Sequence, residues 1–264
     1  MKNKLCKYLA AISITLLCLG FTALAETDPG MNLRYKQSGT GAGALTTSAK
    51  KEAHYPLTAA DVTAQDTDAE REALLRKSKT ALLTDQIILV VDHNLTLWDK
   101  NADGSFTKQM DVYCGYGRNG MKPAAERVEG DGTTPIGTFP ILFAFGFGEN
   151  PGTALTWRSI SPDSYWSGEK ASYNTWVESS KRIAGEHLSE YTICYKKALA
   201  IGFNQDPVVY GRGSAIFLHI KNPATWSSAG CVSVEESNMT ALLAKCHDGV
   251  RMIIVPEQSD IANY

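Results

Sequence analysis

The sequence predicts a mainly β protein with a few helices, preceded by a flexible tether and a short helix. Three β-rich runs follow one another from residue 86, "QIILVV", "LTLWDK" and "SFTKQMDVYCGYG", and Asn, Asp and Gly residues separate them. Runs of this kind between turn residues are typical of an antiparallel meander. The later runs "YTICYKKALAIGF", "PVVYG", "SAIFLHI" and "VRMIIV" predict further strands, and "GDGTTPIGTFPILFAF" predicts short strands broken by Gly and Pro. We therefore place one β-rich domain at residues 86–256.

The segments outside this domain have different compositions. Lysines at the start, the apolar run "LAAISITLLCLGFTAL" and the ending "ALA" predict a secretory signal peptide at residues 1–25, with an uncleaved anchor as the alternative. Residues 26–56 are polar and predict a disordered tether. Residues 57–85 are rich in helix formers and predict a helical linker, and residues 257–264 form a C-terminal tail. We expect an exported protein, outside the cell, in the wall or in the periplasm, with no membrane span after cleavage near Ala25.

Charge and cysteine content exclude several classes of protein. The chain has 26 basic and 28 acidic residues, and three lysines leave with the signal peptide, so the mature chain is acidic and not a nucleic-acid binder. Four cysteines in a chain of this length make no disulfide framework, and a single disulfide between two of them is the alternative. Their spacing is wrong for a zinc knuckle, so we expect no metal. The cysteines that remain after cleavage are Cys114, Cys194, Cys231 and Cys246.

One helix is predicted near the end of the domain. Ser233 and Glu236 fit an S-x-x-E capping box, which predicts that the helix begins at Ser233. An apolar stripe at helical spacing follows, and Asp248-Gly249 ends it. The stripe consists of Met239, Leu242, Leu243 and Cys246.

Cys231 lies two residues before this predicted helix. The positive end of a helix dipole favours a thiolate, which is the nucleophilic form of cysteine. Gly230 allows a sharp bend, so the backbone N–H groups of Ala229, Gly230 and Cys231 are candidates for an oxyanion hole. His219 ends an apolar run twelve residues earlier and is a candidate base for the thiol. On the pattern alone, a structural histidine and a buried cysteine remain the alternative.

The segment "FLHI…SSAGCVSV", with "GDGTTPIGTF" and "IILVVDHNLTLW" before it, resembles the YkuD-like L,D-transpeptidase family of bacterial cell-wall enzymes. The resemblance covers about residues 86–256 and implies an L,D-transpeptidase-like β-sandwich or barrel. It also implies that Cys231 is the acylated nucleophile and His219 the general acid and base. Ser228, Ala229 and Gly230 complete an Ala-Gly-Cys variant of the S-x-G-C motif.

The sequence departs from the commoner family pattern at three points. Ala229 stands where a histidine is usual, Ser233 stands where Asn or Arg is usual, and the gap between His219 and Cys231 is shorter. The fine specificity therefore does not follow from the resemblance. A catalytically silent cell-wall-binding protein is one alternative for this reason. A papain-like peptidase is disfavoured because its cysteine motif is missing.

The resemblance implies peptidoglycan stem peptides as substrates and no cofactor. Cys231 would form a thioester, and an acceptor amine would convert it into a cross-link, whereas water would give L,D-carboxypeptidase activity. A carbapenem is implied as a covalent inhibitor. Four residues near the motif are candidates for binding the substrate: Arg212 and Lys221 for a carboxylate, Trp226 as a wall of the cleft, and Ser228 within the motif.

Overall fold

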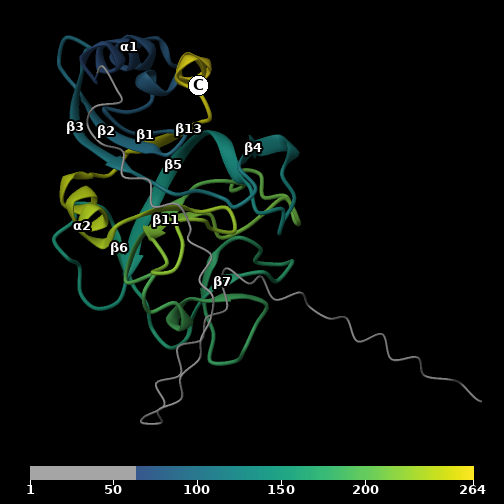
Figure 1. Ribbon diagram of the computed structural model, residues 1–264. Helices are drawn as coiled ribbons and strands as arrows, with labels where there is room; N and C mark the ends of the chain where they lie inside the picture. The colour runs from purple at the N-terminus through teal and green to yellow at the C-terminus, as the bar shows by residue number, and fades with distance from the viewer. Residues whose placement is uncertain (1–63) are drawn as a thin grey trace, which may run out of the picture.

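The computed structural model describes residues 64–264 (Figure 1). The predicted signal peptide and tether therefore lie outside the described residues. The helices are α1 (Ala64–Lys77) and α2 (Glu236–Lys245), with short 3-10 helices η1 (Thr80–Leu82), η2 (Ala124–Glu126), η3 (Leu188–Glu190) and η4 (Gln258–Asn263). The strands are β1 (Gln86–Val91), β2 (Asn94–Lys100), β3 (Phe106–Tyr113), β4 (Met121–Pro123), β5 (Thr134–Gly146), β6 (Trp157–Ser159), β7 (Ser164–Ser167), β8 (Trp176–Glu178), β9 (Gly185–His187), β10 (Lys197–Ile201), β11 (Phe217–Ile220), β12 (Val232–Val234) and β13 (Arg251–Val255).

Most strands belong to one large mixed sheet in the order β12-β11-β10-β5-β13-β1-β2-β3. The predicted meander is confirmed, because β1 pairs antiparallel with β2 and β2 with β3. The short strands predicted in "GDGTTPIGTFPILFAF" are instead one strand, β5. It continues through Pro140 because β13 pairs with residues 137–140 and β10 with residues 141–146. The predicted strand "PVVYG" is wrong: residues 207–211 form a loop whose apolar side chains reach the solvent.

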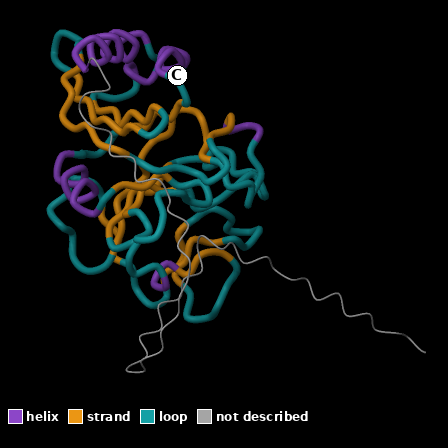
Figure 2. The backbone as a smooth tube through the Cα atoms, viewed as in Figure 1, coloured by secondary structure: helices purple, strands orange, loops and turns teal. Residues whose placement is uncertain are grey.

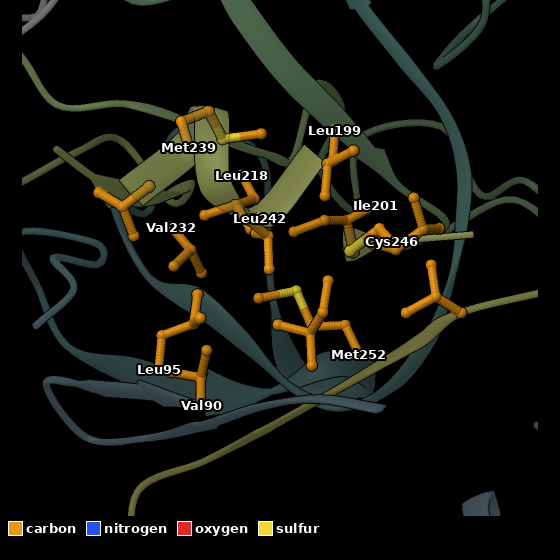
Figure 3. Packing of buried hydrophobic residues seen from close by; sticks show 14 of the residues in the cluster. Val90, Leu95, Leu199, Ile201, Leu218, Val232, Met239, Leu242, Cys246 and Met252 are labelled. Carbon is orange, nitrogen blue, oxygen red and sulfur yellow. The ribbon is translucent and has the colours of Figure 1, made fainter. Parts of the chain in front are cut away.

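The main core lies between the sheet and α2. The predicted stripe of α2 is confirmed as buried, and Figure 3 shows Met239 and Leu242 on one side of the cluster, with Val90 and Leu95 on the other. Alternate residues of β1 face the opposite side of the sheet, where a second layer covers them. That layer consists of α1 and η4 (Figure 1).

Residues 64–83 and the C-terminus are held together on this second layer. The Thr80 amide donates to the Tyr264 carbonyl, and the Arg71 side chain donates to Gln258. Leu75 and Ile261 are both fully buried there. The linker helix and the C-terminal segment thus share one small core. Within residues 64–264, neither helix is long and apolar enough to cross a membrane.

Leu75 is the main apolar anchor of α1, so its removal tests this packing. A Leu75→Ala variant is expected to lose about 2–5 kcal/mol of unfolding free energy, because truncation of a buried leucine leaves a cavity. Urea denaturation followed by circular dichroism measures the loss. Lys77→Ala, at an exposed position of the same helix, is the control and should change stability by less than about 0.5 kcal/mol. Equal stability of both variants would contradict this role of Leu75.

A small second sheet lies at the other end of the molecule. Strands β8, β7 and β9 form it in that order, and Figure 2 shows these short strands among long loops, far from α1. The sequence between Trp157 and Trp176 predicts an irregular surface insertion, but it is ordered here and buries Trp166 against Phe217 of β11. We call this unit, residues 160–195, the cap.

Candidate active site

His219 and Cys231 lie on the same face of two adjacent parallel strands. Strand β11 pairs with β12 so that Leu218 lies opposite Val232 and His219 opposite Ser233. Side chains alternate along a strand, so Cys231, one residue before Val232, shares its face with Phe217 and His219. The amide of Phe217 donates to the Cys231 sulfur at 3.4 Å. Cys231 and His219 are therefore diagonal neighbours on one face of this strand pair.

A backbone carbonyl orients the imidazole of His219. Its Nδ1 lies 2.8 Å from the Ile220 carbonyl oxygen, which can only accept, so Nδ1 carries the proton and Nε2 is left as the basic atom. The ring of Tyr195 packs edge-on at 5.6 Å between centroids. His219 is only 8% exposed, and this burial lowers the pKa of the imidazole to about 4. The side chain is therefore a neutral base at physiological pH.

Cys231 is 3% exposed and does not lie at a helix start. The prediction that the helix begins at Ser233 is wrong, because α2 begins at Glu236 after an N-cap at Glu235 that has no side-chain cap. Ser233 is used by the sheet instead: its amide donates to the Gly115 carbonyl, and its hydroxyl donates to the Trp226 carbonyl. Ser233 therefore forms hydrogen bonds with residues distant in the sequence instead of capping the helix.

The thiol of Cys231 is consequently protonated at rest. Burial raises its pKa well above the ordinary range, and the charge of Glu186 adds to this, while the Phe217 amide and Arg127 oppose it. The sulfur can donate to the Ala215 carbonyl at 3.3 Å. A nucleophile at this position needs a base to remove the proton, because no helix dipole does so.

Ser228 holds the turn that leads into Cys231. Its hydroxyl donates to the Cys231 carbonyl at 2.6 Å and accepts from the Gly230 amide at 3.0 Å. Thr134, at the start of β5, donates to the Gly230 carbonyl. Of the N–H groups that the sequence suggested for an oxyanion hole, the one of Gly230 is thus already engaged. Ser228 builds this turn from within.

Arg127 lies behind the turn, and no sequence pattern predicts a role for it there. The guanidinium is almost fully buried, donates to Thr133 and pairs with Asp131 at 3.3 Å. Its Nη1 has no hydrogen-bond partner in the described part of the chain. These contacts explain the "GDGTT" segment, which the sequence suggested only as a turn: its side chains hold a cation next to Gly230.

Gly230 cannot carry a side chain without strain. Its φ is +143°, and a Cβ atom there would lie 2.8 Å from the Thr133 carbonyl oxygen and 3.1 Å from Arg127. Gly230→Ala is expected to lose about 2–4 kcal/mol of unfolding free energy through backbone strain and overpacking. Thermal unfolding measures it. Gly104→Ala, also at positive φ but in open space, should lose only about 1 kcal/mol, and equal losses would contradict the steric argument.

The remaining candidates lie around this centre. Lys221 is engaged with Glu235 at 3.6 Å and lies over the ring of Trp226. Arg212 is partly exposed in the loop before β11. Trp226 lines a cavity of about 250 Å³, and neither Cys231 nor His219 lines it. The other lining residues are His93, Tyr116, Gly117, Arg118, Gly120 and Ser227.

The cap encloses the thiol. Cys231 belongs to an apolar cluster with Trp166, Leu188 and Tyr195 of the cap and Phe217 of the main sheet. All four cysteines of the described region are free, so the sulfur is not held in a disulfide there. Within residues 64–264 no group of His, Cys, Asp and Glu is arranged to hold a metal ion. The arrangement can supply one buried nucleophile and one buried base.

Among known proteins, the chain has distant similarity to several solved structures. No curated protein sequence matches the chain. Solved structures that resemble it include the helical cell shape determining protein Pgp2 from Campylobacter jejuni (14% identity, TM-score 0.39, 74% of this chain and 59% of that one). A mutant L,D-transpeptidase from Enterococcus faecium is 14% identical, with a TM-score of 0.33 over 66% of this chain and 51% of that one. An L,D-transpeptidase from Stackebrandtia nassauensis is 15% identical, with a TM-score of 0.32 over 72% of this chain and 67% of that one.

The chain spans roughly half to two thirds of the length of these solved proteins. Residues 85–255, about two thirds of the chain, match the family described as the YkuD L,D-transpeptidase catalytic domain. This range contains the meander, the cap and both strands of the candidate site. The chain belongs to the YkuD family of L,D-transpeptidase catalytic domains.

Proposed function

We propose that this protein is an exported cysteine L,D-transpeptidase that acts on peptidoglycan stem peptides through a thioester on Cys231. One observation carries the proposal: Cys231 and His219 share a face of adjacent strands, with the imidazole held so that Nε2 is its basic atom. Family membership supplies the reaction class. Export rests on the signal peptide expected at residues 1–25, and the secreted chain should have the mass of residues 26–264.

Acylation starts from two neutral groups. His219 Nε2 takes the thiol proton as the sulfur attacks the scissile carbonyl carbon, and a C–S bond forms. The C–N bond to the following residue then breaks, and the imidazolium gives its proton to the leaving amine. His219 is neutral again at the end. Its low pKa favours this, because a strongly acidic imidazolium protonates the amine readily.

The enclosed position of Cys231 favours transfer over hydrolysis. The sulfur lies in an apolar cluster under the cap, and a site that excludes water protects a thioester until an amine arrives. An L,D-carboxypeptidase would need water at the same carbon. Among the binding candidates, Arg212 is suited to a stem carboxylate, and Trp226 with its cavity is suited to hold more distant parts of the substrate.

Incubation of the purified mature protein with tetrapeptide stems tests the proposal, with products identified by mass spectrometry. A transpeptidase gives cross-linked dimer, and intact-protein mass spectra show a transient adduct on Cys231. Trimmed tripeptide without dimer would replace the proposal by carboxypeptidase activity. Neither product, and no adduct, would identify a silent wall-binding protein.

A further inference from the structure

Glu186 of the cap points toward the reactive strands. In the β7–β9 pair it lies opposite Trp166, and directly paired residues of an antiparallel sheet point to the same side. The Trp166 ring packs against Phe217 with 4.9 Å between centroids, and the Phe217 amide donates to the Cys231 sulfur. The carboxylate of Glu186 is therefore on the face of the cap that covers the nucleophile.

A single side chain, Tyr195, connects Glu186 to His219 and to Phe217, the residue whose amide donates to the Cys231 sulfur. The hydroxyl of Tyr195 donates to the Glu186 carboxylate at 2.5 Å. The ring of the same tyrosine packs against Phe217 at 5.4 Å and against His219 at 5.6 Å. Tyr195 is fully buried, so it fixes the position of the Glu186 carboxylate, whose charge reaches the Cys231 thiol.

Within the described cap, no cation balances the negative charge of Glu186. Burial and the Tyr195 hydroxyl set the environment of this carboxylate, although the cap contains ion pairs elsewhere, as between Arg182 and Glu190. Burial raises the pKa of Glu186 to about 7, and its charge disfavours the Cys231 thiolate. A partly buried, unbalanced carboxylate is costly, and here it also opposes formation of the nucleophile. Neither effect helps acylation.

The second half reaction supplies the missing cation. The acceptor of a transpeptidase is an alkyl amine, which with a pKa of about 10.4 arrives as an ammonium ion. We propose, on the basis of the proposed function, that Glu186 binds this ammonium group and removes its first proton, so that the cap selects a cationic amine over water as the acceptor.

The protons balance in this step. The ammonium gives one proton to Glu186, which becomes a carboxylic acid and later returns it to the solvent. The free amine attacks the thioester carbon, a C–N bond forms and the C–S bond breaks. The second proton leaves the nitrogen for Nε2 of His219 and passes to the sulfur, which restores the thiol.

The experiment compares two acceptors on the same acyl-enzyme. Glu186→Gln keeps the size and the hydrogen bond to Tyr195 but removes the charge. It should form the Cys231 thioester within about threefold of the wild-type rate, while transfer to an amine stem falls about a hundredfold. Transfer to hydroxylamine, which is uncharged at neutral pH, should be retained. Glu190→Gln, an exposed glutamate of the same cap that pairs with Arg182, is the matched control.

The outcomes separate this inference from the proposed function. If wild-type protein forms no thioester, the proposed function fails, and this inference fails with it. If thioester forms but Glu186→Gln transfers to both acceptors as wild type does, or loses both equally, only the role of Glu186 is overturned. A variant-free test uses wild-type protein: a stem bearing a trimethylammonium group should compete with the amine acceptor but leave hydroxylamine transfer unchanged, and absence of competition would overturn the inference.

Discussion

A Cys231→Ala variant is expected to lose thioester formation and cross-linking by about a thousandfold or more, because the carbonyl carbon has no other nucleophile. The measurement is intact-protein mass spectrometry after exposure to a tetrapeptide stem. A carbapenem is the second probe, and we expect an adduct on wild-type protein and none on the variant. Thermal unfolding should change little, because the side chain that is removed is small.

Cys194→Ala is the matched control for this prediction. Cys194 packs against the same cluster and is also free, but it is more exposed than Cys231. Its removal should leave cross-linking and carbapenem acylation unchanged. Undiminished turnover of Cys231→Ala, or a carbapenem adduct that persists in it, would show that another group is the nucleophile.

The strands with strong apolar patterns could be predicted from the sequence, and those fixed by distant partners could not. The meander from Gln86 to Tyr113 is set by local alternation and turn residues, and it is confirmed. The length of β5 depends on an exchange of partner strands at Pro140, which no local pattern records. The Trp- and Ser-rich sequence of the cap is typical of a surface loop. Trp166 is buried only because it packs against Phe217, which is distant in the sequence.

The same distinction applies to the site. Cys231 and His219 could be chosen from a motif and its spacing, and the strand pairing places them on one face. The helix start at Ser233 could not be judged locally, because the competing partner of Ser233 is Gly115. Arg127 and Glu186 could not be found either. Each is a common charged residue in an unremarkable segment, and only tertiary packing brings it close to the thiol.

Because α2 begins only at Glu236, no helix dipole acts on Cys231, and the proposed nucleophile has to be activated in another way. A thiolate prepared in advance would need positive potential, but Cys231 has only Arg127 nearby and is opposed by burial and by Glu186. The resting pair is therefore a neutral thiol and a neutral imidazole. In the proposed reaction, proton transfer then has to occur as the substrate is attacked, so the rate should depend on the base much more than it would with a stable thiolate.

His219→Gln is accordingly expected to slow acylation of Cys231 by about a hundredfold to ten-thousandfold, the range that a positioned general base contributes. Single-turnover acylation followed by mass spectrometry measures this. Because the pKa of His219 is about 4, the wild-type kcat/KM should stay constant as the pH falls to about 5. With an ordinary histidine as the base, kcat/KM would already decrease below about pH 6.5. His247→Gln, which changes a partly exposed histidine outside the site, should leave the rate and the profile unchanged.

The same pKa predicts a stability effect that does not depend on activity. In the unfolded chain His219 takes up a proton below about pH 6.5, whereas in the folded chain it does so only below about 4. Between these values the unfolded state binds more protons, so the folded state loses stability as the pH falls, by up to about 3 kcal/mol for this group. Urea denaturation at pH 7 and pH 4.5 should show that the wild type loses more unfolding free energy at the lower pH than His219→Gln does, since glutamine does not titrate. Equal losses in the two proteins would mean that the imidazole is not buried and neutral, and His219 would then lack the environment that makes it a base.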